Sequence, residues 1–271
     1  MIALALVIGV GIGIVVGALG AGGGILSVPV LVYLIGMEPH DATAASLVIV
    51  AVTALVSLRH PAKNGNVAWR EGFVFAAFAL VSSAIASRLS LFVPSHLLMV
   101  LFAVLLLSVG VMMARRGRTT LRAERPHPVV DDPMATARPA STASPARSRV
   151  RSLLPLILAA TATGTLTGFF GVGGGFLAVP MLVIALGLPI RKAAGTSLLV
   201  MIMTALAALL ARIGTPTHID WPVVLLFVLG SSVGGLIGGP LSARAKPSTL
   251  TFLFAALLFV LGIVTLATSV F

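Results

Sequence analysis

Residues 17–57 read GALGAGGGILSVPVLVYLIGMEPHDATAASLVIVAVTALVS, and residues 168–208 read GFFGVGGGFLAVPMLVIALGLPIRKAAGTSLLVMIMTALAA. The two stretches align without a gap, and 17 of the 41 aligned pairs are identical. The identities include a glycine triplet, a proline and a serine in each copy, namely Gly22–Gly24 and Gly173–Gly175, Pro29 and Pro180, and Ser46 and Ser197. A glycine-rich break that recurs in two apolar repeats indicates a membrane fold with internal symmetry and points to a transporter binding site.

The composition is that of a membrane protein. Of the 271 residues, 58% are hydrophobic and 9% are charged, whereas soluble domains carry about 25% charged residues. Apolar runs of about 20 residues, long enough to cross a bilayer, recur along nearly the whole chain. Backbone groups without hydrogen-bond partners are too costly in lipid, so these runs must be helical. We therefore expect an all-α polytopic membrane protein.

Each copy divides into about five apolar segments. We expect them at residues 2–19, 25–36, 42–58, 70–90 and 94–114, and at residues 153–170, 176–187, 193–211, 221–240 and 248–268. The second segment of each copy has roughly twelve residues, which give a helix of roughly 18 Å against a hydrocarbon core of about 30 Å. The first two segments of each copy are therefore expected to form a hairpin with glycines at its tip and a short or broken second helix.

A basic linker separates the two copies. We expect the first transmembrane repeat at residues 1–115, the linker at 116–152 and the second transmembrane repeat at 153–271. The linker is rich in Arg, Pro, Ser, Ala and Thr and has almost no large apolar residue. It cannot bury a core and is expected to be disordered. It is either a plain tether or a segment whose basic residues are attracted to anionic lipid headgroups.

The odd number of segments predicts that the two copies enter the membrane from opposite sides. If the linker is cytoplasmic, sixteen of the 18 Lys and Arg residues lie inside, and only Arg88 and Arg212 lie outside. This distribution follows the positive-inside rule. It predicts two inverted-topology repeats, as in many secondary transporters, with both chain termini extracytoplasmic.

Several kinds of chemistry are disfavoured by what the chain lacks. It has no cysteine, and its five histidines are expected in loops without i, i+4 spacing, so no metal site or cofactor is expected. No Walker A sequence, HExxH motif or Ser-His-Asp set is present, so we do not expect an enzyme. The acidic residues lie in loops, in the linker or at segment ends, which disfavours a pump with a buried carboxylate. The net charge of +11 comes largely from the linker and the segment ends, so nucleic acid is not an expected partner.

The glycine motifs can form an anion site from the backbone alone. Consecutive glycines permit left-handed backbone and the close approach of a ligand. The helix that follows presents N–H groups without intrahelical partners and the positive end of its dipole. The expected site residues are Gly20, Gly22, Gly23 and Gly24 in the first copy, and Gly171, Gly173, Gly174 and Gly175 in the second. The alternative is close helix packing, which we favour for the run GSSVGGLIGG at residues 230–239.

Hydroxyl side chains on the third segment of each copy complete the expected binding site. They are Thr43 and Ser46 in the first copy, and Thr196 and Ser197 in the second. The alternative is that each hydroxyl bonds the carbonyl four residues earlier in its own helix, as is common in membrane helices. Pro29 and Pro180 are expected to bend the short helices and so to affect gating.

The doubled pattern G-x-G-G-G-x-L-x-V-P, at residues 20–29 and 171–180, resembles the TauE/SafE sulfite exporter family. Its members are also called toluene-sulfonate uptake permeases. The resemblance covers nearly everything except the linker, including Trp69 and Trp221 at the starts of the fourth segments. It implies transport of sulfite, sulfonates or other organosulfur anions across a bacterial inner membrane. The partners would be a small anionic substrate and the lipid bilayer.

Three hypotheses for the function follow. The first is a secondary transporter that works by alternating access, with the glycine hairpins and the third helices forming the site. The second is an anion channel with the same site. The third is a non-transporting membrane scaffold whose basic linker recruits lipid or a partner. The sequence leaves open the anion carried, the direction of transport, the coupling ion, the oligomeric state and the role of the linker.

Overall fold

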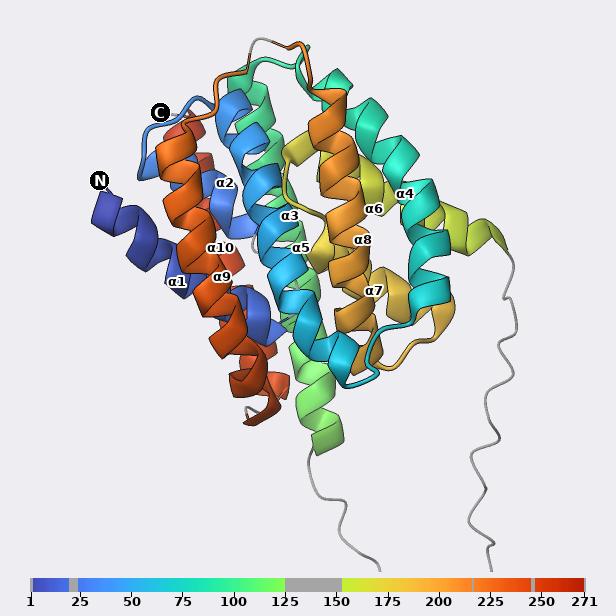
Figure 1. Ribbon diagram of the computed structural model, residues 1–271. Helices are drawn as coiled ribbons and strands as arrows, with labels where there is room; N and C mark the ends of the chain where they lie inside the picture. The colour runs from blue at the N-terminus through green and yellow to red at the C-terminus, as the bar shows by residue number, and fades with distance from the viewer. Residues whose placement is uncertain (1, 20–23, 125–152, 216, 245–246, 271) are drawn as a thin grey trace, which may run out of the picture.

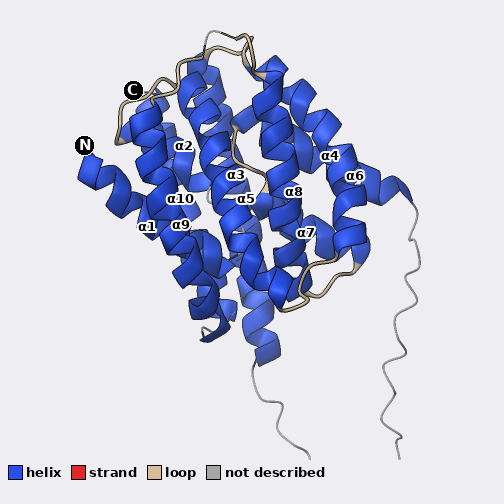
Figure 2. Cartoon of the chain, viewed as in Figure 1, coloured by secondary structure: helices blue, strands red, loops and turns tan. Residues whose placement is uncertain are grey.

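The computed structural model describes residues 2–19, 24–124, 153–215, 217–244 and 247–270, and this part of the chain forms α-helices joined by short loops, without a strand (Figures 1 and 2). The first half contains α1 (Ile2–Leu19), α2 (Gly24–Tyr33), α3 (Pro39–Lys63), α4 (Trp69–Ser90) and α5 (Ser95–Glu124). The second half contains α6 (Leu153–Phe170), α7 (Gly175–Leu186), α8 (Ile190–Ala211), α9 (Trp221–Arg244) and α10 (Pro247–Val270). The two halves thus contain the same succession of helices.

The helices lie within a few residues of where the apolar pattern places them, and the largest extensions are those of α3 and α5. The second helix of each half is the short one, since α2 has 10 residues and α7 has 12. Helix α3 extends beyond both ends of the expected segment 42–58, and α5 continues past residue 115 to Glu124, into the expected linker. Residues 125–152 of that linker lie outside the described residues. Among the described helices, α3, α4, α5, α8 and α9 are long and apolar enough to cross a membrane, which confirms an all-α polytopic membrane protein.

The packing of the helices is symmetric between the two halves: each of the most extensive contacts between two helices has an equivalent contact between their counterparts in the other half. Helix α1 packs along α9, and its counterpart α6 packs along α4. In the same way α3 packs against α9 and α8 against α4, while α3 with α8 and α5 with α10 are pairs of counterparts. The loop after α3 lies at the lower end of the bundle in Figure 1 and the chain after α8 at the upper end, so α3 and α8 run in opposite directions. A two-fold axis between the halves would produce this pattern.

Glycines bring the outer helices close together. A Cβ atom on Gly13 of α1 would lie 2.7 Å from the Cα of Ser231 in α9. A Cβ atom on Gly168 of α6 would lie 2.9 Å from the Cα of Ser83 in α4. Both distances are too short for a side chain, so the backbones touch at these positions. Ser231 belongs to the run at residues 230–239, which therefore contributes to helix packing.

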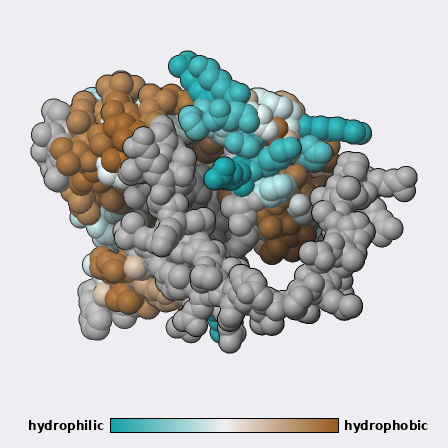
Figure 3. All heavy atoms as spheres, turned by 90° about the horizontal axis from the view of Figure 1, so that it is seen from below, coloured by the Kyte–Doolittle hydropathy of each residue, from teal (hydrophilic) through white to brown (hydrophobic). Residues whose placement is uncertain are grey.

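The lower end of the bundle in Figure 1 carries basic side chains. Lys63 ends α3, Arg70 lies in the first turn of α4, and Arg191 and Lys192 lie in the first turn of α8. Figure 3 looks at this end and shows hydrophilic side chains gathered beside hydrophobic flanks. Large apolar side chains are exposed along α4 and α9. Such a surface suits a lipid environment.

Helices α3 and α8 form the central pair of the bundle. Leu47, Val50 and Ala54 of α3 are buried in one cluster with Leu198 and Met201 of α8. The two helices belong to different halves, so the core of the fold lies where the halves meet. The glycine loops are positioned against this pair.

Candidate functional site

The second glycine loop joins α6, which ends at Phe170, to α7, which begins at Gly175. Gly171, Gly173 and Gly174 have φ angles of 67°, 73° and 58°, all in the left-handed region. A residue with a Cβ atom is disfavoured there by roughly 1–2 kcal/mol. The backbone conformation of this turn therefore explains why its sequence is rich in glycine.

The loop is buried against the central helix of the other half. A Cβ atom on Gly171 would lie 2.9 Å from the Cα of Thr43, and one on Gly173 would lie 3.1 Å from the Cβ of Val50. The loop residues from Gly171 to Gly174 are all buried. Backbone conformation and close packing thus both require glycine here. The contact also crosses between the halves, since Thr43 and Val50 belong to α3.

The start of α7 presents backbone donors to the buried loop. The Gly174 carbonyl accepts hydrogen bonds from the N–H groups of Leu177 at 3.1 Å and Ala178 at 2.8 Å. The N–H groups that precede these in the helix have no intrahelical acceptor, and the positive end of the helix dipole lies there. A buried helix start of this kind can bind an anion without a Lys or Arg side chain.

Ser46 holds the second glycine loop to α3. Its Oγ lies 3.2 Å from the Thr43 carbonyl oxygen and also donates to the Gly171 carbonyl oxygen. The Thr43 hydroxyl donates to the His40 carbonyl at 2.8 Å. Both hydroxyls expected in the first copy of the site therefore lie beside the loop. They donate to backbone carbonyls, so Ser46 positions the loop in this structure.

Ser46→Ala is expected to lower the free energy of unfolding by about 1–2 kcal/mol, because it removes the hydrogen bond to the buried Gly171 carbonyl. Ser108→Ala is the matched control, since the Ser108 hydroxyl donates to the Leu105 carbonyl of its own helix at 2.8 Å on an exposed face. Thermal unfolding of both variants in the same detergent measures the difference. Equal melting temperatures would show that Ser46 does not stabilise the loop.

Of the two hydroxyls expected in the second copy, that of Thr196 lies away from the second glycine loop. Thr196 Oγ1 donates to the Lys192 carbonyl at 2.7 Å and accepts a hydrogen bond from the Ala68 N–H at 2.9 Å. Ser197 Oγ donates to the Ala194 carbonyl at 2.7 Å. Thr196 therefore holds the loop between α3 and α4 to the start of α8, at the lower end of the bundle in Figure 1. The structure brings Thr43 and Ser46, but not Thr196, to the second glycine loop.

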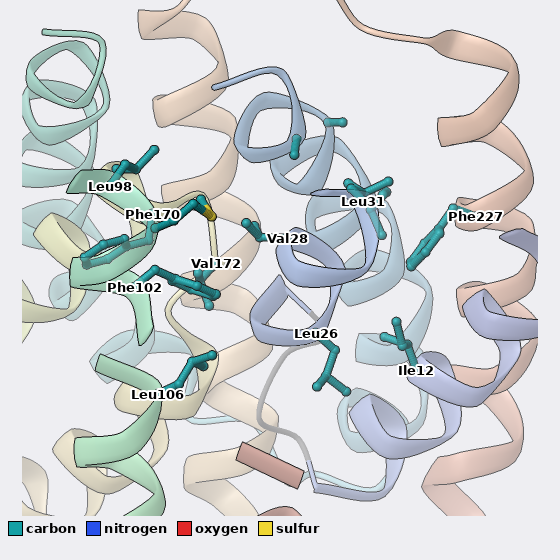
Figure 4. Packing of buried hydrophobic residues seen from close by; sticks show 14 of the residues in the cluster. Ile12, Leu26, Val28, Leu31, Leu98, Phe102, Leu106, Phe170, Val172 and Phe227 are labelled. Carbon is teal, nitrogen blue, oxygen red and sulfur yellow. The ribbon is translucent and has the colours of Figure 1, made fainter. Parts of the chain in front are cut away.

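The beginnings of the two short helices meet in one apolar core. Three of the expected site glycines lie outside the described residues, namely Gly20, Gly22 and Gly23. Gly24 is the first residue of α2. Leu26 and Val28 of α2 are buried in the same cluster as Val172 and Leu177 of the second hairpin. Figure 4 shows Val28 and Val172 in this cluster. The starts of α2 and α7 therefore share a core although they belong to different halves.

The two short helices are also alike in their prolines and in their ends. Pro29 lies inside α2 and Pro180 inside α7, where a proline removes one backbone hydrogen bond of the helix. Gly36 after α2 and Gly187 at the end of α7 have φ angles of 80° and 66°. The prolines thus weaken both short helices at equivalent positions. Their part in gating stays a prediction.

Arg212 is a buried cation in the structure, whereas the charge pattern of the sequence predicts only that it lies on the outer side of the membrane. It follows α8 directly, and only 3% of its surface is exposed. Burial lowers the pKa of Arg212 to about 10, while the charge of Asp41 acts in the opposite direction, so the guanidinium stays protonated at neutral pH. The sequence contains one signal for the burial of Arg212. No charged residue lies between Lys192 and Arg212, so Arg212 stands at the edge of a long apolar run.

Comparisons with known proteins show the family. The family model "Sulfite exporter TauE/SafE" matches residues 5–265. A "Probable membrane transporter protein" of Xylella fastidiosa is 32% identical over 88% of this chain and 83% of its own length. Proteins named as probable membrane transporters in Methanocaldococcus jannaschii and Bacillus subtilis are 24% and 25% identical, over 97% and 94% of this chain. No solved structure matches.

The family match extends over both glycine motifs and over helices of both halves. The Xylella protein is matched over most of its own length, so the likeness concerns the whole fold. The resemblance based on the doubled glycine pattern is therefore confirmed. The chain belongs to the sulfite exporter TauE/SafE family.

Proposed function

We propose that this protein is a secondary transporter that moves small anions across the bacterial inner membrane by alternating access. The family description names sulfite, and we include sulfonates and related organosulfur anions in the proposed substrate class because they are chemically similar. The observation that carries the proposal is the buried second glycine loop, where the start of α7 lies against α3 of the other half. The relatives named as membrane transporters support the general activity.

The loop suits a small oxyanion. An anion at the start of α7 would accept hydrogen bonds from the first N–H groups of the helix, and such bonds are stronger in a low-dielectric interior than in water. Buried apolar neighbours such as Phe170 and Val172 keep water away from the loop. A site made of partial charges holds an anion less tightly than a full cation does. That property favours release on the far side of the membrane.

The contacts at the two ends of the bundle support alternating access. At the lower end in Figure 1, the Ala68 N–H donates to Thr196 of α8. At the upper end, the His218 N–H donates to Asp41 of α3 at 2.9 Å. Each end is thus closed by a loop of one half that bonds the central helix of the other half. We infer that these two closures open in turn, as inverted repeats exchange conformations.

The orientation that we propose places the linker in the cytoplasm and both chain termini outside. The basic side chains at the start of α8 and at the end of α3 lie at the same end of the bundle as the end of α5 (Figure 1). That end would be cytoplasmic by the positive-inside rule.

A ligand screen by thermal unfolding tests the proposal. Purified protein is heated with sulfite, thiosulfate, sulfoacetate or taurine, with chloride as the control anion. A ligand at 100 times its dissociation constant stabilises a protein by about 2.7 kcal/mol, so we expect at least one sulfur-containing anion to raise the melting temperature by several degrees. If none of the four does so, the proposed substrate class is wrong.

The rate of flux separates the transporter from the alternative functions. A channel with the same site would conduct far faster and would show no countertransport. A scaffold that acts through its basic linker would lose its function on deletion of residues 119–148, whereas a transporter would stay largely active. Saturable, trans-stimulated flux that survives the deletion is the result expected here.

A further inference from the structure

Arg212 is the one fully buried charged side chain among the described residues. Removing an ionised group from water is costly unless hydrogen bonds or an opposite charge compensate it. An ion pair requires a carboxylate oxygen within 4.0 Å of a guanidinium nitrogen. Among the described residues, Arg212 has no such partner. Asp41, whose charge acts on Arg212, instead accepts a hydrogen bond from the His218 N–H. The direct partners of the Arg212 guanidinium in the described part of the chain are therefore all neutral groups.

The direct partners come from two helices of the first half. Nε donates to Ser87 Oγ at 2.8 Å, and one Nη2 hydrogen goes to Ser90 Oγ at 3.0 Å, both on α4. Nη1 donates to Thr43 Oγ1 at 2.8 Å and to the His40 carbonyl at 3.1 Å, both on α3. The guanidinium thus links the end of α8 to the start of α3 and the end of α4. It lies at the end of the bundle opposite the linker.

The chemistry of this cluster is that of an oxyanion site. A guanidinium offers donors in a planar fork that matches two oxygens of one anion. Each hydroxyl that now accepts from Arg212 also carries a hydrogen of its own. In this structure those hydrogens are donated to backbone carbonyls, from Ser87 to Ala208, from Ser90 to Ser87 and from Thr43 to His40. The three hydroxyls would turn away from these carbonyls to donate to an anion that binds the guanidinium. Hydrogen bonds from a cation to an anion are about twice as strong as those to neutral acceptors.

The cluster is also connected to the second glycine loop. Thr43, which accepts from Arg212, has its backbone in contact with Gly171. Ser46 contacts the carbonyl oxygens of both Thr43 and Gly171. An anion on Arg212 would therefore lie one residue away from the loop that we propose as the transport site.

We propose that Arg212, with the hydroxyls of Thr43, Ser87 and Ser90, forms a second anion-binding site on the transport path, at the end of the bundle opposite the linker. The anion takes the place of the hydroxyl acceptors on the guanidinium and itself accepts hydrogen bonds from these hydroxyls, so that it replaces the direct contacts of α8 with α3 and α4. This site deepens the proposed function and rests on it. It supplies the full positive charge that the glycine loops lack.

The test is equilibrium binding of sulfite, thiosulfate, sulfoacetate and taurine to purified wild-type protein and to Arg212→Gln, Arg212→Lys and Arg88→Gln. Arg88 lies exposed in the last turn of α4, at the same end of the bundle, so Arg88→Gln removes the same charge without touching the cluster. For whichever anion the wild type binds, we expect Arg212→Gln to raise the Kd at least about tenfold, because a charge-assisted donor is lost. Arg212→Lys should be intermediate, and Arg88→Gln should bind within about twofold of the wild type.

A double variant covers the case in which Arg212→Gln does not fold. Ser87→Ala with Ser90→Ala keeps the guanidinium but removes two of the hydroxyls, and we expect its Kd to rise several-fold. A purely structural role for Arg212 would lower the melting temperature but leave the Kd of the folded protein unchanged. An unchanged Kd in the folded Arg212→Gln protein, or in the double variant, overturns this inference and leaves the transport proposal standing. Absence of binding by the wild type overturns both.

Discussion

Gly171→Ala is expected to reduce anion uptake at least tenfold while the protein still inserts into the membrane. The new Cβ atom would lie 2.9 Å from the Cα of Thr43 and would collide with the Thr43 carbonyl oxygen. It would also hold alanine at a φ of 67°, which costs roughly 1–2 kcal/mol. Neither α3 nor the loop has free space there, so the start of α7 must move. Uptake of labelled sulfite by proteoliposomes, at matched protein content, measures the loss.

Gly187→Ala is the control that separates backbone strain from packing. Gly187 has a φ of 66°, nearly the same as Gly171, but a Cβ atom there would meet nothing within 4 Å. The two variants therefore carry the same strain and differ in the collision. Uptake by Gly187→Ala should stay within about twofold of the wild type, because its strain lies outside the loop. Equal uptake by both variants would show that the close approach of the loop to α3 is not needed for transport.

The second large effect concerns stability. Gly13→Ala is expected to lower the free energy of unfolding by about 1–3 kcal/mol, because its Cβ atom would lie 2.7 Å from the Cα of Ser231 and force α1 away from α9. Thermal unfolding in detergent measures the fall in melting temperature.

Gly11→Ala, on the same helix, is the matched control. A Cβ atom on Gly11 meets nothing within 4 Å, and alanine favours a helix over glycine by up to about 1 kcal/mol. We expect its melting temperature to equal or slightly exceed that of the wild type. A loss of stability in Gly11→Ala as large as that in Gly13→Ala would show that the contact between α1 and α9 is not the cause.

The helices and the glycine turn could be predicted because they depend on local sequence. Segment length, apolar runs and glycine-rich breaks are properties of neighbouring residues, so the expected start of the second short helix at residue 176 differs by one from the observed start at Gly175. The need for glycine at residues 171, 173 and 174 likewise follows from backbone angles that few other residues adopt. The duplication then predicted the second short helix from the first.

The environment of single side chains could not be predicted in the same way. Arg212 is expected to be exposed if only its neighbours in the chain are considered, yet its acceptor Ser87 lies 125 residues away and Thr43 lies 169 residues away. The contact of Ser46 with Gly171 also joins residues 125 apart. Such contacts arise only when the two halves pack together. The sequence predicted that Ser46 belongs near the glycines, but not that its hydroxyl would bond the loop itself.

The central claim is that the anion site opens to one side of the membrane and then to the other as the two halves exchange conformations. The most direct test is counterflow in proteoliposomes, in which vesicles preloaded with unlabelled sulfite receive labelled sulfite outside. Alternating access predicts uptake that saturates with concentration and that the internal anion accelerates. Uptake that is linear in concentration and indifferent to the internal anion, or no uptake above that of protein-free vesicles, would contradict it.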